Sequence, residues 1–364
     1  MQTIKITDVF KVITPIAKIN SRDFLSEGAF PIISQDASRI SGYWNSEADV
    51  THISKPVIVF GDHTRVVKFI DFDFVVGADG VKILEPLDTI DPKYLYYWFH
   101  ANPIKSLGYA RHYRILKDKK IIVPSLSDQQ RIVKRLDEVF NAVDQAITLN
   151  AKNIENTHLL FTSLLSQLLG SHETTTIPLD RYCDFQGGSQ PPKSNFVFKP
   201  QTGFVRFLQI RDFKKDIEPT FIPVSNRNKI CNEDDVMIGR YGASVGNILR
   251  GKAGAYNVAL MKTIPDTDYI DKDFLYYYLS SDLFQVPLLA LTSRSAQDGF
   301  NKNDLSTIKI QLPSLSDQKN IAQKLLTIQK STTALRQNLV QKRNQLESLK
   351  NSLISNAYTQ STVE

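Results

Sequence analysis

The sequence predicts two pseudo-symmetric globular domains of mixed α/β (α+β) type, separated by two long helices that form an antiparallel coiled coil. Three observations support this class. A 13-residue segment occurs twice in the chain. Each copy is followed by a long segment in which apolar residues recur at helical spacing, and each is preceded by short segments typical of strands. A chain of 364 residues, 42% of them hydrophobic, is long enough for two domains with separate cores.

The repeat sets the expected domain boundaries. Pro124–Leu136 matches Pro313–Leu325 at eight of thirteen positions, and both copies begin Pro-Ser-Leu-Ser-Asp-Gln. Upstream, Ile90–Phe99 matches Ile270–Leu279, so the second copy carries nine extra residues between these anchors. Such insertions belong in loops. The expected division is a globular domain over 1–123, a long helix over 124–170, a globular domain over 171–312 and a long helix over 313–364.

Both repeated segments are typical of helix starts, because proline ends the preceding strand and serine or aspartate caps the first turn. The apolar residues downstream of each start are spaced by three and four, as in a coiled-coil seam. The first helix has two successive spacings of four at Val143, a stutter that locally unwinds a supercoil. The expected seam residues are Ile132, Leu136, Val139, Val143, Ile147, Ile154, Phe161, Leu164 and Leu168, then Ile321, Leu325, Ile328, Leu335, Leu339, Leu346, Leu349 and Leu353.

Helices with so narrow an apolar stripe are unstable alone in water and must pack against something. We expect the two helices to pair with each other within the chain. The alternatives are that each helix packs on its own domain or on another subunit.

Composition favours a cytoplasmic protein. The two cysteines, Cys183 and Cys231, have no metal-ligand spacing and are too few for a disulfide framework. The start of the chain lacks a basic flank followed by an apolar run, and no stretch approaches a membrane span, so no membrane partner is expected. The net charge of +6 permits a nucleic-acid partner without requiring one.

The Leu-Tyr-Tyr segments at 95–97 and 275–277 follow Asp91 and Asp271 and are expected to form short helices. Their aromatic side chains could stack on nucleic-acid bases. Because they occur at repeated positions on helices, we favour packing in the core.

Motifs that would indicate catalysis are missing or incomplete. Residues 246–253 have the glycine and lysine spacing of a phosphate-binding loop, but Ala253 replaces the serine or threonine that binds magnesium, so we interpret the match as chance. The chain has no His-Glu-x-x-His zinc pair, no Glu-x-Lys nuclease pattern and no Asn-Pro-Pro-Tyr or Asp-Pro-Pro-Tyr tetrad. We therefore expect no catalytic residue, no metal site and no cofactor bound by this chain.

Loops that recur at equivalent places in the two halves, and a third loop at 187–193 near the start of the second domain, are candidate DNA contacts. They combine glycine or polar residues with cations, and arginine can read guanine with two hydrogen bonds, although phosphate contact is commoner. The alternative is an ordinary turn with solvated charges. The candidates in the first domain are His63, Thr64 and Arg65 in one loop and Arg111, His112 and Arg114 in another. Those in the second are Ser189, Gln190 and Lys193, then Arg240, Tyr241 and Ser244, then Arg294, Gln297 and Lys302.

Over essentially its whole length the chain resembles the specificity subunit of Type I restriction-modification enzymes. The resemblance is carried by the paired helix starts at 124 and 313, the two Leu-Tyr-Tyr helices and the Gly-Gly-Ser-Gln-Pro-Pro segment at 187–192. It implies that each globular domain is a target-recognition domain that reads one half of a split double-stranded DNA site. Because the two domains differ between their shared anchors, an asymmetric target is expected.

The resemblance also implies partners. Two methyltransferase subunits would dock on the helices and domains, bind S-adenosylmethionine and methylate adenine, and restriction subunits would join through them. The helix pair would act as a ruler between the half-sites. The alternatives are the same subunit in a methyltransferase-only or fused restriction system and, from another class, a coiled-coil scaffold with two non-DNA ligand domains.

Overall fold

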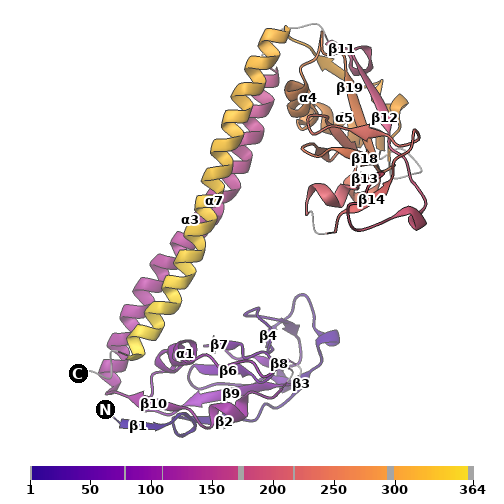
Figure 1. Cartoon of the computed structure of the whole chain (residues 1–364). Coiled ribbons are helices and arrows are strands. Elements are labelled where there is room, and N and C mark those ends of the chain that lie inside the picture. Colours follow the sequence, from indigo (N-terminus) through magenta and orange to yellow (C-terminus); the bar gives the residue numbers. More distant parts are fainter. Residues whose placement is uncertain are drawn as a thin grey trace. The chain divides into compact units, whose positions relative to one another are not determined.

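The computed structural model describes residues 2–77, 79–108, 110–170, 176–215, 218–292 and 299–359. The chain forms two compact units, one of Met1–Lys152 with Leu339–Glu364 and the other of Asn153–Asn338. Each unit contains a mixed α/β domain and parts of both long helices (Figure 1). The predicted fold class is therefore confirmed.

The domain of the first unit contains two four-stranded sheets and a two-stranded ribbon. The first sheet is antiparallel, in the order β2 (Phe10–Ile13), β9 (Val81–Pro86), β6 (Val57–Gly61) and β7 (Val67–Ile70). The second is mixed, in the order β3 (Lys18–Ile19), β8 (Val75–Gly77), β4 (Phe30–Ile33) and β5 (Gly42–Trp44). The ribbon pairs β1 (Gln2–Lys5) with β10 (Lys120–Val123), and the domain's helices are α1 (Pro92–Ala101) and α2 (Tyr113–Leu116).

The domain of the second unit also contains two four-stranded sheets and a two-stranded ribbon. Its antiparallel sheet has the order β12 (Cys183–Gly187), β19 (Leu260–Pro265), β16 (Met237–Gly239) and β17 (Ile248–Leu249). Its mixed sheet has the order β14 (Thr220–Pro223), β13 (Phe204–Leu208), β18 (Gly254–Tyr256) and β15 (Ile230–Cys231). The ribbon pairs β11 (Thr176–Pro178) with β20 (Lys309–Gln311), and the domain's helices are α4 (Lys272–Leu279), α5 (Asp282–Thr292) and α6 (Lys302–Leu305).

Of the tyrosines in the Leu-Tyr-Tyr segments, Tyr97 and Tyr277 lie in the cores as predicted (7% and 1% exposed), whereas Tyr96 and Tyr276 are partly buried and pack against the cores. Tyr94 is 0% exposed and its hydroxyl donates to the carbonyl of Ile122 in β10 at 3.0 Å. Tyr278 is 2% exposed and donates to the carbonyl of Lys309 in β20 at 2.6 Å. Each hydroxyl therefore satisfies its own hydrogen bond inside the domain, and neither ring is available for base stacking.

The two long helices are α3 (Leu126–Gly170) and α7 (Leu315–Thr359), each of 45 residues. Each begins at the predicted cap, because the hydroxyl of Ser125 accepts from the amide of Asp128, and that of Ser314 accepts from the amide of Asp317, both at 3.2 Å. No helix in the described ranges is long and apolar enough to cross a lipid bilayer.

The helices pair antiparallel within each unit. In the first unit the start of α3 packs with the end of α7, where Leu136 and Ile354 join one core with the residues of α1. In the second unit the end of α3 packs with the start of α7, where Leu165 and Leu325 join the core around α4. Each domain therefore buries apolar side chains of both long helices: the helix that follows it in sequence and the helix that follows the other domain.

The predicted seam is partly displaced in α7. The predicted seam residues of α3 are all at least half-buried, but Leu335 and Leu349 of α7 are each 47% exposed. Beside Leu349, the side chain of Lys350 lies over the ring of Phe140 and its ammonium pairs with Asp144 at 2.8 Å, so a lysine covers this stretch. Nothing in the structure accounts for Leu335 in the same way.

Candidate nucleic-acid interface

The turn between β6 and β7 carries the first predicted loop of domain one. Its backbone closes through the amide of Gly61, which donates to the carbonyl of Val66 at 2.8 Å, and Arg65 adopts a φ of 65° in the left-handed region. The hydroxyl of Thr64 donates to the carbonyl of Gln35 at 2.6 Å, and the amide of His63 donates to the Gln35 side chain at 3.2 Å. The side chains of Thr64 and Arg65 remain exposed.

The second predicted loop of domain one lies against this turn. The guanidinium of Arg65 donates to the carbonyl of Ile104 at 3.3 Å. The carboxylate of Asp62, in the turn, accepts from the amide of Tyr113 at 2.7 Å. Two loops that are about 40 residues apart in sequence therefore form one surface.

His112 has a structural role that differs from its predicted one. It is 0% exposed, its Nδ1 donates to the carbonyl of Asp62 at 2.9 Å, and its Nε2 accepts from the amide of Leu107 at 3.1 Å. With both ring nitrogens used inside the protein, this side chain is not placed to contact DNA. The prediction failed because a histidine among cations was grouped with them, whereas its aromatic ring fits the interior between the two loops.

The cations next to His112 in sequence face solvent, in contrast to the buried histidine. Arg111 and Arg114 are both exposed, and Arg114 lies on the short helix α2. The same segment also exposes Lys105, Lys117 and Lys120. The arrangement presents several positive charges to solvent on a backbone that is anchored by His112 and Asp62.

In domain two, Arg240 connects three loops at one edge. Its amide donates to the carbonyl of Ala259 at 2.9 Å, and its guanidinium makes weak contacts with the carbonyls of Val258 (3.5 Å) and Phe300 (3.4 Å). The guanidinium also lies 4.9 Å from the ring centre of Tyr241, which is 40% exposed. Arg240 is therefore half-buried and turned towards its own domain, with Tyr241 on the outer side.

The glycine-rich segment after β12 joins the same edge. A side chain at Gly188 would meet the carbonyl of Asn257 at 2.1 Å, so only glycine allows this close approach. The amide of Ser189 donates to the carbonyl of Tyr256 at 3.1 Å, and the side chain of Gln190 accepts from the side chain of Asn257 at 2.5 Å. Gln190 is itself exposed.

The other predicted residues of domain two differ in their surroundings. Lys193 is exposed in a short turn of 3-10 helix, and Ser244 is half-buried in another. Lys302 pairs with Asp184, and hydrogen bonding to Lys302 is the main cause of the lowered pKa of that carboxyl. Arg294 and Gln297 lie outside the described residues.

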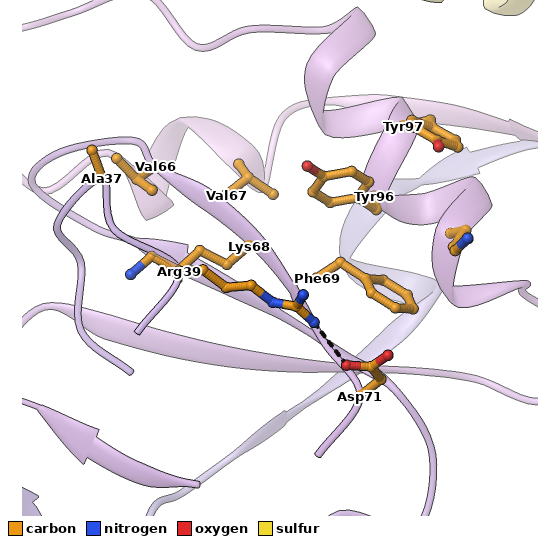
Figure 2. Close-up of a pocket in the computed structure, with 10 residues that line it drawn as sticks. Ala37, Arg39, Val66, Val67, Lys68, Phe69, Asp71, Tyr96 and Tyr97 are labelled. Carbon is orange, nitrogen blue, oxygen red and sulfur yellow. Dashed lines mark hydrogen bonds and ion pairs between the residues drawn. The ribbon is translucent and has the colours of Figure 1, made fainter. Parts of the chain in front are cut away.

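A cleft in the first unit lies between β7 and α1 (Figure 2). Its lining includes Arg39, Lys68 and Lys93, which could suggest an anion site. Each cation is already paired with an acid: Arg39 with Asp71 at 3.0 Å, Lys68 with Asp36 at 3.3 Å and Lys93 with Asp137 at 2.6 Å. Burial lowers the pKa of Lys68. The charges of this cleft are balanced within the protein, so we do not place a phosphate there.

Sequence reasoning missed two polar residues that organise these surfaces. Gln35 joins the loop after β4 to the β6–β7 turn and also donates to the carbonyl of Asp79 at 2.9 Å. Asn257, after β18, holds Gln190 and accepts from the amide of Ala259 at 2.7 Å. The contacts of Gln35 with His63 and Asp79, and that of Asn257 with Gln190, join segments far apart in sequence. A lone amide residue after a strand gives no local signal of them.

The sequence matches the family described as the Type I restriction modification DNA specificity domain twice, over residues 1–169 and 172–348. Among curated proteins, it is 23% identical over 331 residues to the Type I restriction enzyme EcoR124I/EcoR124II specificity subunit of Escherichia coli, covering 84% of this chain and 80% of that protein. It is 26% identical over 238 residues to a putative type I restriction enzyme MjaX specificity subunit of Methanocaldococcus jannaschii, covering 58% of this chain and 53% of that protein.

Solved structures share the fold. A chain from a study of complex assembly and conformational transition of the type I R-M system has a TM-score of 0.76 at 18% identity, covering 98% of this chain and 97% of that one. The HsdS subunit from Thermoanaerobacter tengcongensis has a TM-score of 0.58 at 20% identity, covering 98% and 96%. With each family match spanning a domain and most of its following helix, this chain belongs to the family of specificity subunits of type I restriction-modification enzymes.

Proposed function

We propose that the chain is the DNA-reading subunit of its complex, and that each domain reads one half of an asymmetric bipartite site in double-stranded DNA. The observation that carries this proposal is the convergence of loops at one edge of each domain. In the first unit the edge exposes Thr64, Arg65, Arg111 and Arg114; in the second it exposes Gln190 and Tyr241. Since the two sets differ in chemistry, two different half-sites are expected.

The exposed residues divide into two roles. Arg111 and Arg114 suit contacts with phosphates, because cations on anchored backbone neutralise the DNA strand without reading its sequence. Gln190 and Tyr241 lack a full charge and suit contacts with base edges or sugars. Arg240 supports Tyr241 and the loops around it, and would reach a base only after leaving the carbonyls that it contacts.

The chemistry of modification belongs to partners in this proposal. Two methyltransferase subunits carry S-adenosylmethionine and methylate adenine, restriction subunits join the complex, and this chain has no catalytic role and binds no cofactor. The duplicated plan of domain and helix supports two copies of one partner, because each copy would meet an equivalent surface. The antiparallel helices set the spacer between the half-sites, so that binding of one domain makes binding of the second effectively intramolecular.

Two measurements on the chain in complex with its methyltransferase test the proposal. Methylation-sensitive sequencing of DNA from a host carrying the complex should yield one motif with two different halves and a constant spacer. Binding to that motif at two salt concentrations should weaken steeply as salt rises, because phosphate neutralisation releases counterions. A salt-independent affinity, or methylation without a bipartite motif, would sink the proposal and favour a scaffold with other ligands.

A further inference from the structure

The sixth residue of each repeated Pro-Ser-Leu-Ser-Asp-Gln segment is a fully buried glutamine. Gln129 and Gln318 are both 0% exposed, although they lie near the start of α3 and α7, among exposed neighbours. A buried amide is costly unless its donors and acceptor are satisfied. A buried glutamine at the same position of both repeats indicates that its side chain has a structural role inside each unit.

The two glutamines make the same three hydrogen bonds. Gln129 accepts from the amide of Asp91 at 2.9 Å and donates to the carbonyls of Thr89 and Pro124, both at 3.0 Å. In the second unit, Gln318 accepts from the amide of Asp271 at 2.9 Å. It donates to the carbonyls of Tyr269 at 2.8 Å and Pro313 at 2.9 Å. The pattern recurs atom for atom, although the second copy has extra residues between the bonded segments.

Each network joins the long helix to the recognition domain. Asp91 caps α1, since its carboxylate accepts from the amides of Lys93 (2.9 Å) and Tyr94 (3.0 Å). Asp271 caps α4 in the same way, accepting from Asp273 and Phe274, both at 3.0 Å. A single amide group therefore connects the start of the long helix, the segment that enters it and the cap of the domain's aromatic helix.

Other polar contacts between the domain helix and the long helix are not shared. In the first unit Tyr97 donates to Asp137, whereas in the second Tyr277 donates to Gln329 at 3.0 Å. Lys93 also pairs with Asp137, while its counterpart Asp273 pairs with Arg250 of its own domain. The glutamine contact is therefore present in both units, whereas the neighbouring contacts differ between the two units.

We propose that Gln129 and Gln318 are positioning residues that fix the angle at which each recognition domain leaves its long helix, and thereby the spacer that the complex accepts. This inference rests on the proposed function. A loosened angle lets a domain reach its half-site at more than one distance, while the loops that read the half-site stay unchanged. The expected signature is a broadened spacer with unaltered half-site sequences.

The test uses the full chain in complex with its methyltransferase and a plasmid library in which the motif's spacer is native or changed by one base pair. Gln318→Met and Gln129→Met keep the side-chain volume and remove all three hydrogen bonds. The matched controls are Gln323→Met and Gln130→Met, at exposed positions on the same helices. Each glutamine variant should lose about tenfold in preference for the native spacer, which corresponds to the lower end of the net effect of three hydrogen bonds. The controls should keep the wild-type preference.

Gln318→Asn, which retains the amide but shortens its reach, serves as the second variant if the methionine variant does not fold. Methylation that falls equally at every spacer, or half-sites that change while the spacer holds, overturns the inference. So does loss of cooperative unfolding in both variants, since the amide would then act in folding alone. A wild-type complex that methylates no bipartite motif would instead contradict the proposed function.

Discussion

At the scale of single residues, His112 and Arg111 are neighbours with opposite roles. His112→Ala removes the partner of the Leu107 amide and one of the two donors to the Asp62 carbonyl in a buried site, and the backbone amide of residue 112 remains as the other donor. The free energy of unfolding of the first unit should fall by about 2–3 kcal/mol. Both tryptophans of the chain, Trp44 and Trp98, lie in this unit, so urea unfolding followed by tryptophan fluorescence measures it selectively.

Arg111→Ala is the matched control, because this side chain is exposed. Its unfolding should change by no more than about 0.5 kcal/mol. The DNA affinity of the complex should instead fall for all sequences, and its dependence on salt should weaken by about one counterion. The opposite pattern, with Arg111 affecting stability and His112 only DNA binding, would show that the two roles are reversed.

The cysteines offer a second prediction at this scale. Burial raises the pKa of Cys183 to about 12 and that of Cys231 to about 11, and both thiols are free. Since the thiolate is the reactive form, almost none is present at pH 8. Native protein should therefore resist iodoacetamide at pH 8, and both thiols should react after denaturation in urea. Rapid labelling of either cysteine in the folded protein would contradict this expectation.

At the scale of elements, the stutter at Val143 offers a test of whether the long helices set the spacer between the half-sites. Deleting residues 144–147 removes about one turn, which shortens α3 by about 6 Å and rotates the downstream part of the helix by about 40°. If the helices set the spacer, the preferred spacer should change by roughly two base pairs, given about 3.4 Å per base pair. Methylation-sensitive sequencing of the variant complex measures the change, with Gln145→Ala at an exposed position as the control. An unchanged spacer would show that the helices do not set it.

Local signals predicted the elements that depend on neighbours in sequence. The serine caps of α3 and α7, and the aromatic cores of α1 and α4, follow from residues within a few positions of each other. The seam was harder to predict, because each helix packs on a domain as well as on the other helix. Val133, Phe140 and Leu169 are buried although they lie outside the predicted stripe.

The candidate interface was predictable as a set of loops but not as a surface. Glycines and cations marked the loops at 61–66, 187–193 and 240–246. The contacts that gather them are made by Gln35, Asn257 and His112, and they join segments that are far apart in sequence. The buried role of Gln129 escaped for the same reason, since its partners in the domain lie about 40 residues upstream.

At the scale of the whole molecule, the first unit depends on residues at the end of α7. Ile354 is buried in its core, and the hydroxyl of Tyr358 donates to the carbonyl of Tyr94 at 2.5 Å, with the two rings 5.0 Å apart. Truncation after Asn338 removes this contribution, and it should lower the stability of the first unit by at least about 3 kcal/mol. Tryptophan fluorescence during urea unfolding would measure the loss.

Tyr358→Phe provides a graded control for the truncation. It keeps the ring and removes one hydrogen bond, so the loss should be about 1 kcal/mol. The second unit, Asn153–Asn338, contains no residue of the truncated segment and should keep its resistance to limited proteolysis. An unchanged unfolding midpoint for the first unit in the truncated protein would show that the end of α7 contributes nothing to it.

The shared core of the first unit has a consequence for the order of synthesis. The domain that leaves the ribosome first lacks Ile354 and Tyr358 until the end of α7 has been translated, whereas the second domain has both of its helix segments by residue 338. During that interval the core that contains Leu136 and Phe140 lacks the side chains that α7 supplies. The half of the protein that is made first is therefore the half that completes its folding last.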